Sequence, residues 1–402
     1  MIDKKLIPRP SYEEWLKVFL GKPLIKVLTG IRRSGKSSIL RRVSMSLLAE
    51  GVQEGLVFYV NMELLENERF RDFRILHREV KERAKKFGGR IFLFLDEVQE
   101  ISEWERLANS LLAEGVADIT VTGSNALMLS GELASLLGGR YVELPIFPLV
   151  FSEYAAFRQE APVQELFLQF IQCGGFPGSL ELGPGREQYL EALLDSIVLR
   201  DVVLRHKLRD VALLRKILVY FSDNIGNLLS ARTIAGVLKN ERRSLSVETI
   251  YNYLEYLKQA FVVYEAKPYD IRGKRLLETG GKVYLADLGL RHALLGFRAS
   301  DIGQYLENIL YLELCKRGWK VSVGRVGEWE VDFRAEKGDL RSYFQVAYLT
   351  PDAETLEREL RPLRAIRDNC AKFLLTMDPL PASSEEGIQR MPLVEFLTQA
   401  VD

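Results

Sequence analysis

Cysteine and histidine are scarce in this sequence, which has three of each among 402 residues. The cysteines, Cys173, Cys315 and Cys370, are odd in number and far apart, so they form neither a disulfide framework nor a zinc site. The equally scattered histidines argue against a histidine-based metal centre or catalytic triad. These two absences exclude the common function classes that depend on thiol or imidazole clusters.

The sequence also lacks any long apolar run. A membrane-spanning helix needs about 18 consecutive apolar residues, and no run in this sequence approaches that length. The N-terminal segment, MIDKKLIPRPSYEEW, has no apolar core of the kind found in secretory signals. Hydrophobic residues make up 47% and charged residues 27% of the chain, as in ordinary globular proteins. We therefore expect a cytoplasmic globular protein without a membrane partner.

An excess of one charge sign is absent as well, because 55 Lys and Arg balance 55 Asp and Glu. This balance excludes a uniformly basic nucleic-acid binder. The charge is nevertheless uneven along the chain, since residues 200–282 hold 16 basic and 9 acidic side chains, a surplus of seven positive charges. A basic middle segment in a neutral protein points to a local anionic partner.

Residues 23–150 alternate short apolar runs with helical patterns. This alternation predicts a parallel α/β sheet with helices covering both faces. The run IFLFL has no polar residue, which favours a central strand buried on both sides. The expected strands are residues 24–29, 56–60, 91–95 and 119–122.

The segment GIRRSGKS, residues 30–37, matches the phosphate-binding pattern G-x-x-x-x-G-K-[ST] in full, between an expected strand and an expected helix. Its glycines allow backbone N–H groups to converge on phosphate oxygens, and the helix N-terminus adds the positive end of a dipole. We expect Lys36 to neutralise the β- and γ-phosphates of ATP and the Ser37 hydroxyl to bind Mg²⁺. The predicted nucleotide-binding residues are Gly30, Ile31, Arg32, Arg33, Ser34, Gly35, Lys36, Ser37 and Ser38.

Two adjacent carboxylates end the expected strand at residues 91–95. We expect Asp96 to hold Mg²⁺ and Glu97 to orient and deprotonate the water that attacks ATP. The alternative is a strand that simply ends in acidic turn residues. The complete phosphate-binding pattern earlier in the chain favours the catalytic interpretation.

Two further segments are candidates for the same site. Ser124 and Asn125 follow the expected strand at 119–122, at the edge of the sheet where parallel sheets bind ligands. Either side chain is expected to bind the γ-phosphate or the attacking water, and an ordinary polar turn is the alternative. Arg140 follows two glycines and is expected to act as an arginine finger on a neighbouring copy in a homo-oligomer, or else to be a solvated turn residue.

The basic middle segment shows three short helical patterns, which end with residues 247–260, followed by a strand pair at 261–266 and 282–286. Ser230 and Ser246 are the expected caps of the second and third helices. A basic turn at residues 270–275 separates the two strands. A helix-turn-helix with a two-stranded wing is typical of a winged-helix domain.

In a winged-helix domain the third helix enters the major groove and the wing reaches the phosphates. Outward positions of this helix include Asn252, Tyr253 and Lys258, but Glu248 and Glu255 place negative charge on the same helix. A packing or protein-contact role is therefore the alternative to DNA binding. The predicted DNA contacts are Arg242, Arg243, Asn252, Arg272, Lys274 and Arg275.

A third pattern of helices and strands begins near residue 302. Glu307 on an expected helix, Asp332 on a strand and Gln345 on the next strand have the spacing of the metal-binding residues in the PD-(D/E)xK nuclease fold. Ala347 stands where that fold needs its lysine, which activates water and stabilises the transition state. We expect a nuclease-like domain that cuts nothing, with a vestigial metal site at Glu307 and Asp332.

The whole chain resembles the predicted AAA+ ATPases of archaea and bacteria, which join a P-loop domain to a C-terminal domain of unknown function 4143. The matching stretches are LTGIRRSGKSS, FLFLDEVQ, VTGSN, LLGGRYVELPIFPLVFSEY, CGGFPG, KVYLADLGLRHALL, YLENILYLEL and EVDF with FQVAY. The resemblance implies an AAA+ domain, a winged helix and a nuclease-like domain in this order. It also implies ATP hydrolysis with Mg²⁺.

These observations predict an α/β protein with three domains: a P-loop AAA+ domain at residues 1–200, a winged-helix domain at 201–290 and a nuclease-like domain at 291–402. The leading hypothesis is a Mg²⁺-dependent ATPase that acts on or at DNA. One alternative is a slow nucleotide-dependent switch that holds a protein partner. The other is a nuclease gated by ATP, against which the missing lysine argues.

Overall fold

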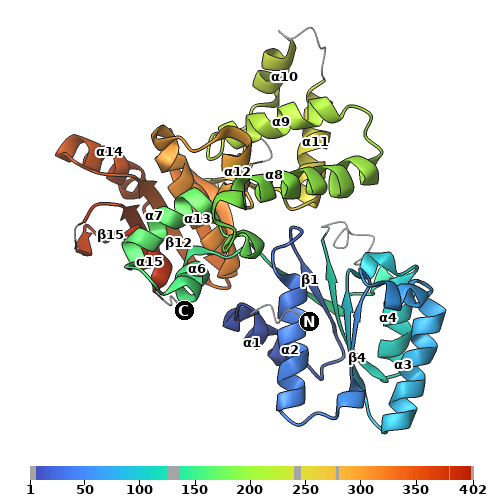
Figure 1. Ribbon diagram of the computed structural model, residues 1–402. Coiled ribbons are helices and arrows are strands. Elements are labelled where there is room, and N and C mark those ends of the chain that lie inside the picture. Colours follow the sequence, from blue (N-terminus) through green and yellow to red (C-terminus); the bar gives the residue numbers. More distant parts are fainter. Residues whose placement is uncertain (1–5, 125–135, 240–245, 278–279, 380, 400–402) are drawn as a thin grey trace. The chain divides into compact units, whose positions relative to one another are not determined.

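The structure, a computed structural model, describes residues 6–124, 136–239, 246–277, 280–379 and 381–399 (Figure 1). It divides into two compact units. One comprises the chain up to Ile146 together with residues 259–261, and the other comprises residues 147–258 and 262 onward. The boundaries that the sequence predicts near residues 200 and 290 both fall inside the second unit. Among the described residues, no helix combines the length and apolar character that a membrane span requires.

The first unit is built on a five-stranded sheet in the order β2-β3-β4-β1-β5. All neighbouring strands are parallel, as the sequence predicts. Strands β1, β3 and β4 carry apolar side chains on both faces because helices cover both faces of the sheet. The strands are β1 (Ile25–Thr29), β2 (Val57–Asn61), β3 (Ile91–Asp96), β4 (Ala117–Gly123) and β5 (Tyr141–Pro145).

Alternate residues of the strands face two different apolar clusters. Leu28 and Phe94 pack with helices α1 (Pro10–Phe19) and α2 (Lys36–Ala49) on one face. On the other face, Val27 and Leu93 pack with α3 (Phe73–Phe87) and α4 (Trp104–Ala113). The unit is therefore a three-layer α/β/α fold, and all parallel strands point their carboxyl ends to one edge, where the phosphate-binding loop lies.

The second unit begins with a series of helices. Asp210, Ser230 and Ser246 cap α9, α10 and α11, and the serine caps are those that the sequence predicts. The α8 helix continues into a π-helical stretch, Val198–Leu204. The helices are α6 (Phe151–Arg158), α7 (Val163–Cys173), α8 (Arg186–Ile197), α9 (Val211–Asp223), α10 (Ala231–Lys239), α11 (Val247–Gln259) and α12 (Leu288–Leu295).

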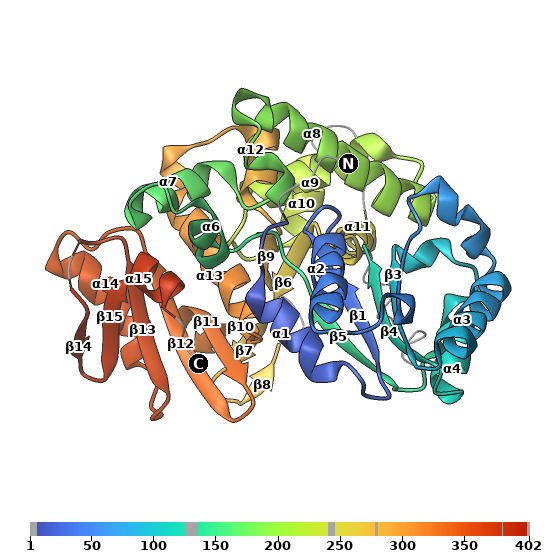
Figure 2. The ribbon, with the colours of Figure 1, turned by 60° about the horizontal axis from the view of Figure 1, so that its bottom comes forward.

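The strand pair after α11 forms, but the predicted basic turn is not its tip. Strand β6 (Val263–Ala266) pairs with β9 (Lys282–Leu285) in antiparallel fashion. Between them, β7 (Pro268–Asp270) and β8 (Arg275–Leu276) form a separate hairpin that pairs with β10 of another sheet (Figure 2). Pro268 has no N–H to continue the β6–β9 ladder, so the chain leaves that ladder there.

An eight-stranded mixed sheet completes the second unit, in the order β14-β15-β13-β12-β11-β10-β7-β8. Helix α14 (Ala353–Arg364) covers one face, where Leu360 and Leu363 pack with Tyr343. On β12, Phe344 alternates with Tyr343 and meets Phe396 of α15 on the other face. The remaining elements are α13 (Ile302–Lys316), β10 (Lys320–Val326), β11 (Trp329–Lys337), β12 (Leu340–Ala347), β13 (Ala371–Thr376), β14 (Ser383–Glu385), β15 (Ile388–Pro392) and α15 (Leu393–Thr398).

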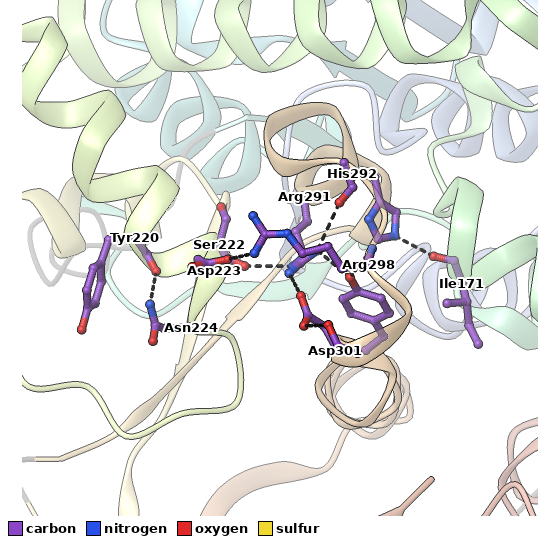
Figure 3. A network of polar contacts seen from close by, with 12 residues as sticks. Ile171, Tyr220, Ser222, Asp223, Asn224, Arg291, His292, Arg298 and Asp301 are labelled. Carbon is purple, nitrogen blue, oxygen red and sulfur yellow. Dashed lines mark hydrogen bonds and ion pairs between the residues drawn. The ribbon is translucent and has the colours of Figure 1, made fainter.

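The stretch KVYLADLGLRHALL holds the helices of the second unit together. Arg291 is fully buried and donates to the Ser222 carbonyl at 3.0 Å, to the Tyr305 hydroxyl at 2.6 Å and to Asp301 (Figure 3). The neighbouring His292 bonds the Ile171 carbonyl at 2.9 Å. A buried guanidinium is stable only when its donors are satisfied, so these residues of the stretch have a structural role.

The stretch CGGFPG needs its glycines for close packing. A Cβ atom on Gly174 would lie 2.2 Å from Oδ1 of Asp287, and one on Gly175 would lie 1.9 Å from the Leu149 carbonyl oxygen. The buried Asp287 carboxylate accepts hydrogen bonds from the backbone N–H groups of Gly175 and Gly289. This stretch therefore joins three segments that are far apart in the sequence.

Gly175→Ala should lower the thermal stability of the second unit, because the added methyl group meets backbone that has no room to move. We expect a loss of about 3 kcal/mol, the upper range for overpacking. Gly303→Ala is the matched control, since Gly303 lies in α13 with open space around its Cβ position. Differential scanning calorimetry should show the control at or above wild-type stability, and equal stability of both variants would contradict the packing described here.

Candidate functional site

The phosphate-binding loop connects β1 to α2 in a conformation that requires glycine. Gly30 has φ 140°, and a Cβ atom there would lie 2.1 Å from the carbonyl oxygen of Ile146. Gly35, directly before α2, has φ 103°. Both are conformations that L side chains rarely adopt, so the two glycines of the motif are fixed by the backbone path.

The Lys36 ammonium group lies inside this loop. Lys36 is 4% exposed, and its Nζ donates to the carbonyl oxygens of Gly30 at 2.8 Å and Ile31 at 3.0 Å. Arg9 donates to the Ser34 carbonyl at 3.0 Å and so supports the loop from outside. Among the other loop residues, Ile31 and Ser34 are buried, Ser38 is half-buried, Arg33 is exposed, and Arg32 lies 3.8 Å from the Glu63 carboxylate.

The predicted acidic pair lies beside the loop. Asp96 is 1% exposed, and its Oδ1 accepts from the Ser37 hydroxyl at 3.0 Å and from the Thr122 hydroxyl at 2.6 Å. Its Oδ2 accepts from the Tyr59 hydroxyl at 2.8 Å. The contact between Ser37 and Asp96 arises because only β4 separates β1 from β3 in the parallel sheet. The carboxyl ends of these three strands therefore meet at one edge of the sheet.

Glu97 follows in a left-handed conformation, with φ 58°, and is 8% exposed. Its backbone N–H donates to the Thr122 hydroxyl at 3.0 Å, and its carboxylate accepts from the Gln99 amide. Thr122 thus connects the two acidic residues. A non-glycine residue in this conformation carries strain, which is typical of functional positions.

The three remaining candidates from the sequence, Ser124, Asn125 and Arg140, do not all belong to this site. Ser124 is fully buried, and its hydroxyl has no hydrogen-bond partner among the residues that the structure describes. Asn125 lies outside the described residues. Arg140 precedes β5 and donates to Asn109 at 3.2 Å, beside the amino end of β1, whereas the loop lies at the carboxyl end. Arg140 is therefore not part of the site in its own chain.

Sequence reasoning missed two residues of the site, Tyr59 and Thr122. Both hold the Asp96 carboxylate through their hydroxyl groups. Burial, with the neighbouring Asp96 charge, raises the pKa of Tyr59 above its ordinary value, so its hydroxyl remains a donor at neutral pH. Both lie at or near the ends of expected strands, and this position is the signal that would have indicated them.

The predicted vestigial metal residues meet a lysine instead. Lys282 on β9 is 4% exposed, and its Nζ lies 2.9 Å from Glu307, 2.9 Å from Glu330 and 3.4 Å from Asp332. The Tyr284 hydroxyl donates to Glu307 at 2.6 Å. Among the described residues, no group of three or more His, Cys, Asp or Glu side chains is arranged to hold a metal ion. An ammonium group thus lies among the carboxylates.

The charges of this cluster depend on one another. Burial lowers the pKa of Lys282, but the surrounding carboxylates outweigh that effect and raise it above its ordinary value. Burial, with the Asp332 charge, raises the pKa of Glu307 to about 7. Gln345 donates to Glu359 at 3.1 Å and accepts from the Asp332 backbone N–H at 3.3 Å, so it too is held within the protein.

The predicted DNA-contact residues are separated in the structure. Arg242 and Arg243 lie outside the described residues. Asn252 is exposed on α11, but Tyr253, which was expected to face outward, is only 7% exposed. Lys258 on the same helix pairs with Glu255 and Glu265. The exposed side chains of the β7–β8 hairpin belong to the eight-stranded sheet and not to the β6–β9 pair; they are Arg272, Lys274 and Arg275.

Two known protein families match parts of this chain, and the first match covers most of the first unit. An AAA domain matches residues 22–155. A domain of unknown function, DUF8612, matches residues 164–301. The second match corrects the expected domain of unknown function 4143: the domain found after the AAA domain is DUF8612.

Two relatives cover most of the chain. An uncharacterised protein of Haemophilus influenzae is 36% identical over 99% of this chain and 100% of its own length. An uncharacterised protein of Methanocaldococcus jannaschii is 30% identical over 86% of this chain and 79% of its own. The chain belongs to the same family as these proteins, with an AAA domain in its N-terminal part. Crystalline Cdc6p of Pyrobaculum aerophilum aligns with 73% of this chain and 94% of its own at 13% identity, with a TM-score of 0.32, too low for any inference.

Lys282→Met should destabilise the second unit, because it leaves three carboxylates around an apolar side chain. We expect a loss of about 3–5 kcal/mol near pH 8, as for other broken buried ion pairs. The loss should be smaller at pH 5, because the Glu307 carboxyl group, whose pKa is raised to about 7, is protonated there and carries no charge. The free energy of unfolding of the variant should therefore fall as the pH rises through that pKa. Urea unfolding at both pH values measures it.

The double variant Lys282→Met with Glu307→Gln serves as the control, because it removes one of the carboxylates that the lysine balances. It should recover part of the lost stability at pH 8. A Lys282→Met protein as stable as wild type at both pH values would show that the ammonium group does not hold this cluster together.

Proposed function

We propose that this AAA-domain protein is a Mg²⁺-dependent ATPase that acts at DNA. The observation that carries the proposal is the 3.0 Å hydrogen bond between Ser37 and Asp96, which brings the phosphate-binding loop and the acidic strand end to one point. The AAA-domain match over residues 22–155 supports a nucleotide as the ligand. The glycine-rich loop before α2 supports a triphosphate in particular.

The chain's own groups account for each part of hydrolysis. Backbone N–H groups of the loop and the start of α2 bind the phosphates, and Lys36 exchanges its two loop carbonyls for the β- and γ-phosphate oxygens. Glu97 accepts a proton from the attacking water, in the orientation that Thr122 fixes through the Glu97 backbone N–H. The Ser124 hydroxyl has no hydrogen-bond partner in the part of the chain that the structure describes, and it is proposed to bind the γ-phosphate or that water. Asn125 is the other candidate for this role.

Ser37 and Asp96 fit the magnesium ion that accompanies ATP. Their oxygen atoms are hard ligands, lie 3.0 Å apart and face the same loop. When bound, Mg²⁺ neutralises charge on the phosphate oxygens. Tyr59 and Thr122 orient the Asp96 carboxylate through its two oxygens, as supporting groups do at metal sites.

DNA is the proposed partner of the second unit. Helices α9, α10 and α11 followed by the antiparallel β6–β9 pair have the order of a winged helix, which supports a contact between α11 and DNA. Residue 252 is an exposed Asn on α11, a side chain that can bond base edges. We infer that the eight-stranded sheet is nuclease-like in fold but does not cut, since position 347 is Ala and Lys282 is held by carboxylates.

A homo-oligomer is the proposed active form. Arg140 is exposed at the edge of the sheet opposite the loop and follows Gly138 and Gly139, which both have positive φ. In that position it is proposed to act on the nucleotide of a neighbouring copy and not on its own.

Two variants test the ATPase proposal. Lys36→Ala should abolish nucleotide binding or hydrolysis, because the loop loses its ammonium group. Glu97→Gln should bind ATP normally but hydrolyse it about 100-fold or more slowly, the usual cost of losing a general base. The measurements are calorimetric ATP binding and steady-state phosphate release.

The matched control is Glu100→Gln, the same substitution at an exposed carboxylate of the same segment that pairs with Arg71. It should retain the wild-type hydrolysis rate. Wild-type turnover by Glu97→Gln would refute the role of Glu97.

DNA should stimulate ATP hydrolysis several-fold if the two units work together as proposed. Phosphate release is measured with duplex DNA, with single-stranded DNA and with heparin as a polyanion control. A rate that no DNA changes, or that heparin raises equally, would favour the slow switch that holds a protein partner.

A further inference from the structure

A basic cavity of about 700 Å³ lies in the second unit, between the β7–β8 hairpin, strands β11 and β12, and the segment after α14. Five of the side chains that line it are cationic: Arg272, Lys274, Arg334, Arg341 and Arg367. They come from three parts of the sequence, the β7–β8 hairpin, the adjacent strands β11 and β12, and the segment after α14, so the fold gathers them. The AAA-domain site in the first unit uses none of them.

Arg334 is the most deeply placed of these cations. It is 3% exposed, and its guanidinium carbon lies 3.6 Å from the ring centroid of Tyr269. Its Nη2 donates to Glu336, while its Nε has no hydrogen-bond partner among the residues that the structure describes. A buried guanidinium with an unused donor, stacked on an aromatic ring at the wall of a cavity, is available to an anion.

The carboxylates near the cavity do not balance its cations. Glu336 pairs with both Arg334 and Arg341, so one carboxylate serves two guanidinium groups. Asp368 lines the cavity and accepts from the Tyr343 hydroxyl at 2.7 Å and from the Cys370 backbone N–H at 3.1 Å.

The other three cations, Arg272, Lys274 and Arg367, form no ion pair within the described part of the chain, and all three are exposed. The five cations and two carboxylates leave a surplus of three positive charges. This surplus is the local excess that a phosphate group would neutralise.

We propose that this cavity binds a phosphate ester of nucleotide size, either a free nucleotide or the 5′-phosphate end of a nucleic-acid strand. Guanidinium groups bind phosphate through paired N–H donors, and four of the five cations are arginines. The volume lies within the range of about 300–1,000 Å³ that small-ligand sites occupy. The site is separate from the phosphate-binding loop and does not depend on ATP hydrolysis.

The cavity also lies next to the Lys282 cluster. Asp332 and Arg334 are two residues apart on β11, where the register against β10 shifts, and Gln345 and Tyr343 are two residues apart on the neighbouring β12. The carboxylates of the cluster repel a second phosphate on that side of the cavity. The arrangement therefore favours binding of one terminal phosphate group over binding of a nucleic-acid strand whose backbone crosses the whole sheet.

The test uses the full-length protein and a short single-stranded DNA with a 5′-phosphate and a 3′-fluorescein, followed by fluorescence anisotropy. The double variant Arg272→Gln with Arg367→Gln should weaken binding about tenfold, as expected for the loss of two charge-assisted contacts. Lys320→Gln with Lys337→Gln is the matched control, because it removes two exposed positive charges of the same sheet that do not line the cavity. The control should change the affinity less than twofold.

Two competitors distinguish the sources of the phosphate. Displacement of the probe by AMP as well as by unlabelled 5′-phosphorylated DNA indicates a free nucleotide, and displacement by the DNA alone indicates a strand end. Equal losses in the two double variants, equal affinity for a 5′-hydroxyl probe, or no binding would overturn the proposal. The Lys36→Ala protein should still bind the probe, so failure of the ATPase proposal and failure of this one give different results.

Discussion

One carboxylate, that of Asp96, receives hydrogen bonds from three hydroxyl groups that lie on separate elements of the first unit. Ser37 comes from the start of α2, Tyr59 from β2 and Thr122 from β4. These bonds form because β3, which ends at Asp96, lies between β2 and β4 in a parallel sheet, and β4 in turn lies beside β1, the strand that leads into the loop and α2. The position of every proposed catalytic group is therefore a consequence of strand order, which the apolar strands and the two flanking helix layers maintain.

The second unit is held by buried polar groups rather than by apolar packing alone. Arg291, Asp287 and Lys282 are each enclosed by partners from distant segments. Such groups are costly unless fully paired, which makes the arrangement of helices and sheet specific. Several of the stretches that carry the family resemblance in this unit thus have structural explanations. The basic cavity, in contrast, gathers cations that its neighbouring carboxylates do not balance.

The first unit could be predicted well from the sequence because local patterns determine it. Apolar runs gave the strands, and the complete loop motif placed Lys36 and Ser37 beside Asp96. Tyr59 and Thr122 were missed because no spacing rule marks a supporting hydroxyl. In the second unit, the basic turn was assigned to the wrong hairpin because Pro268 moves the chain to another sheet. Glu307 and Asp332 were expected to lie together, but Lys282 was not expected beside them, because only tertiary structure brings β9 to these carboxylates.

The most direct test of the central claim is a double-variant cycle on ATP binding with Mg²⁺, measured by isothermal titration calorimetry. Ser37→Ala and Asp96→Asn are made singly and together. If both side chains serve one nucleotide-bound magnesium ion, each single variant weakens ATP binding and the double variant is little weaker than either. Additive losses, or a wild-type protein that takes up no ATP, would contradict the account.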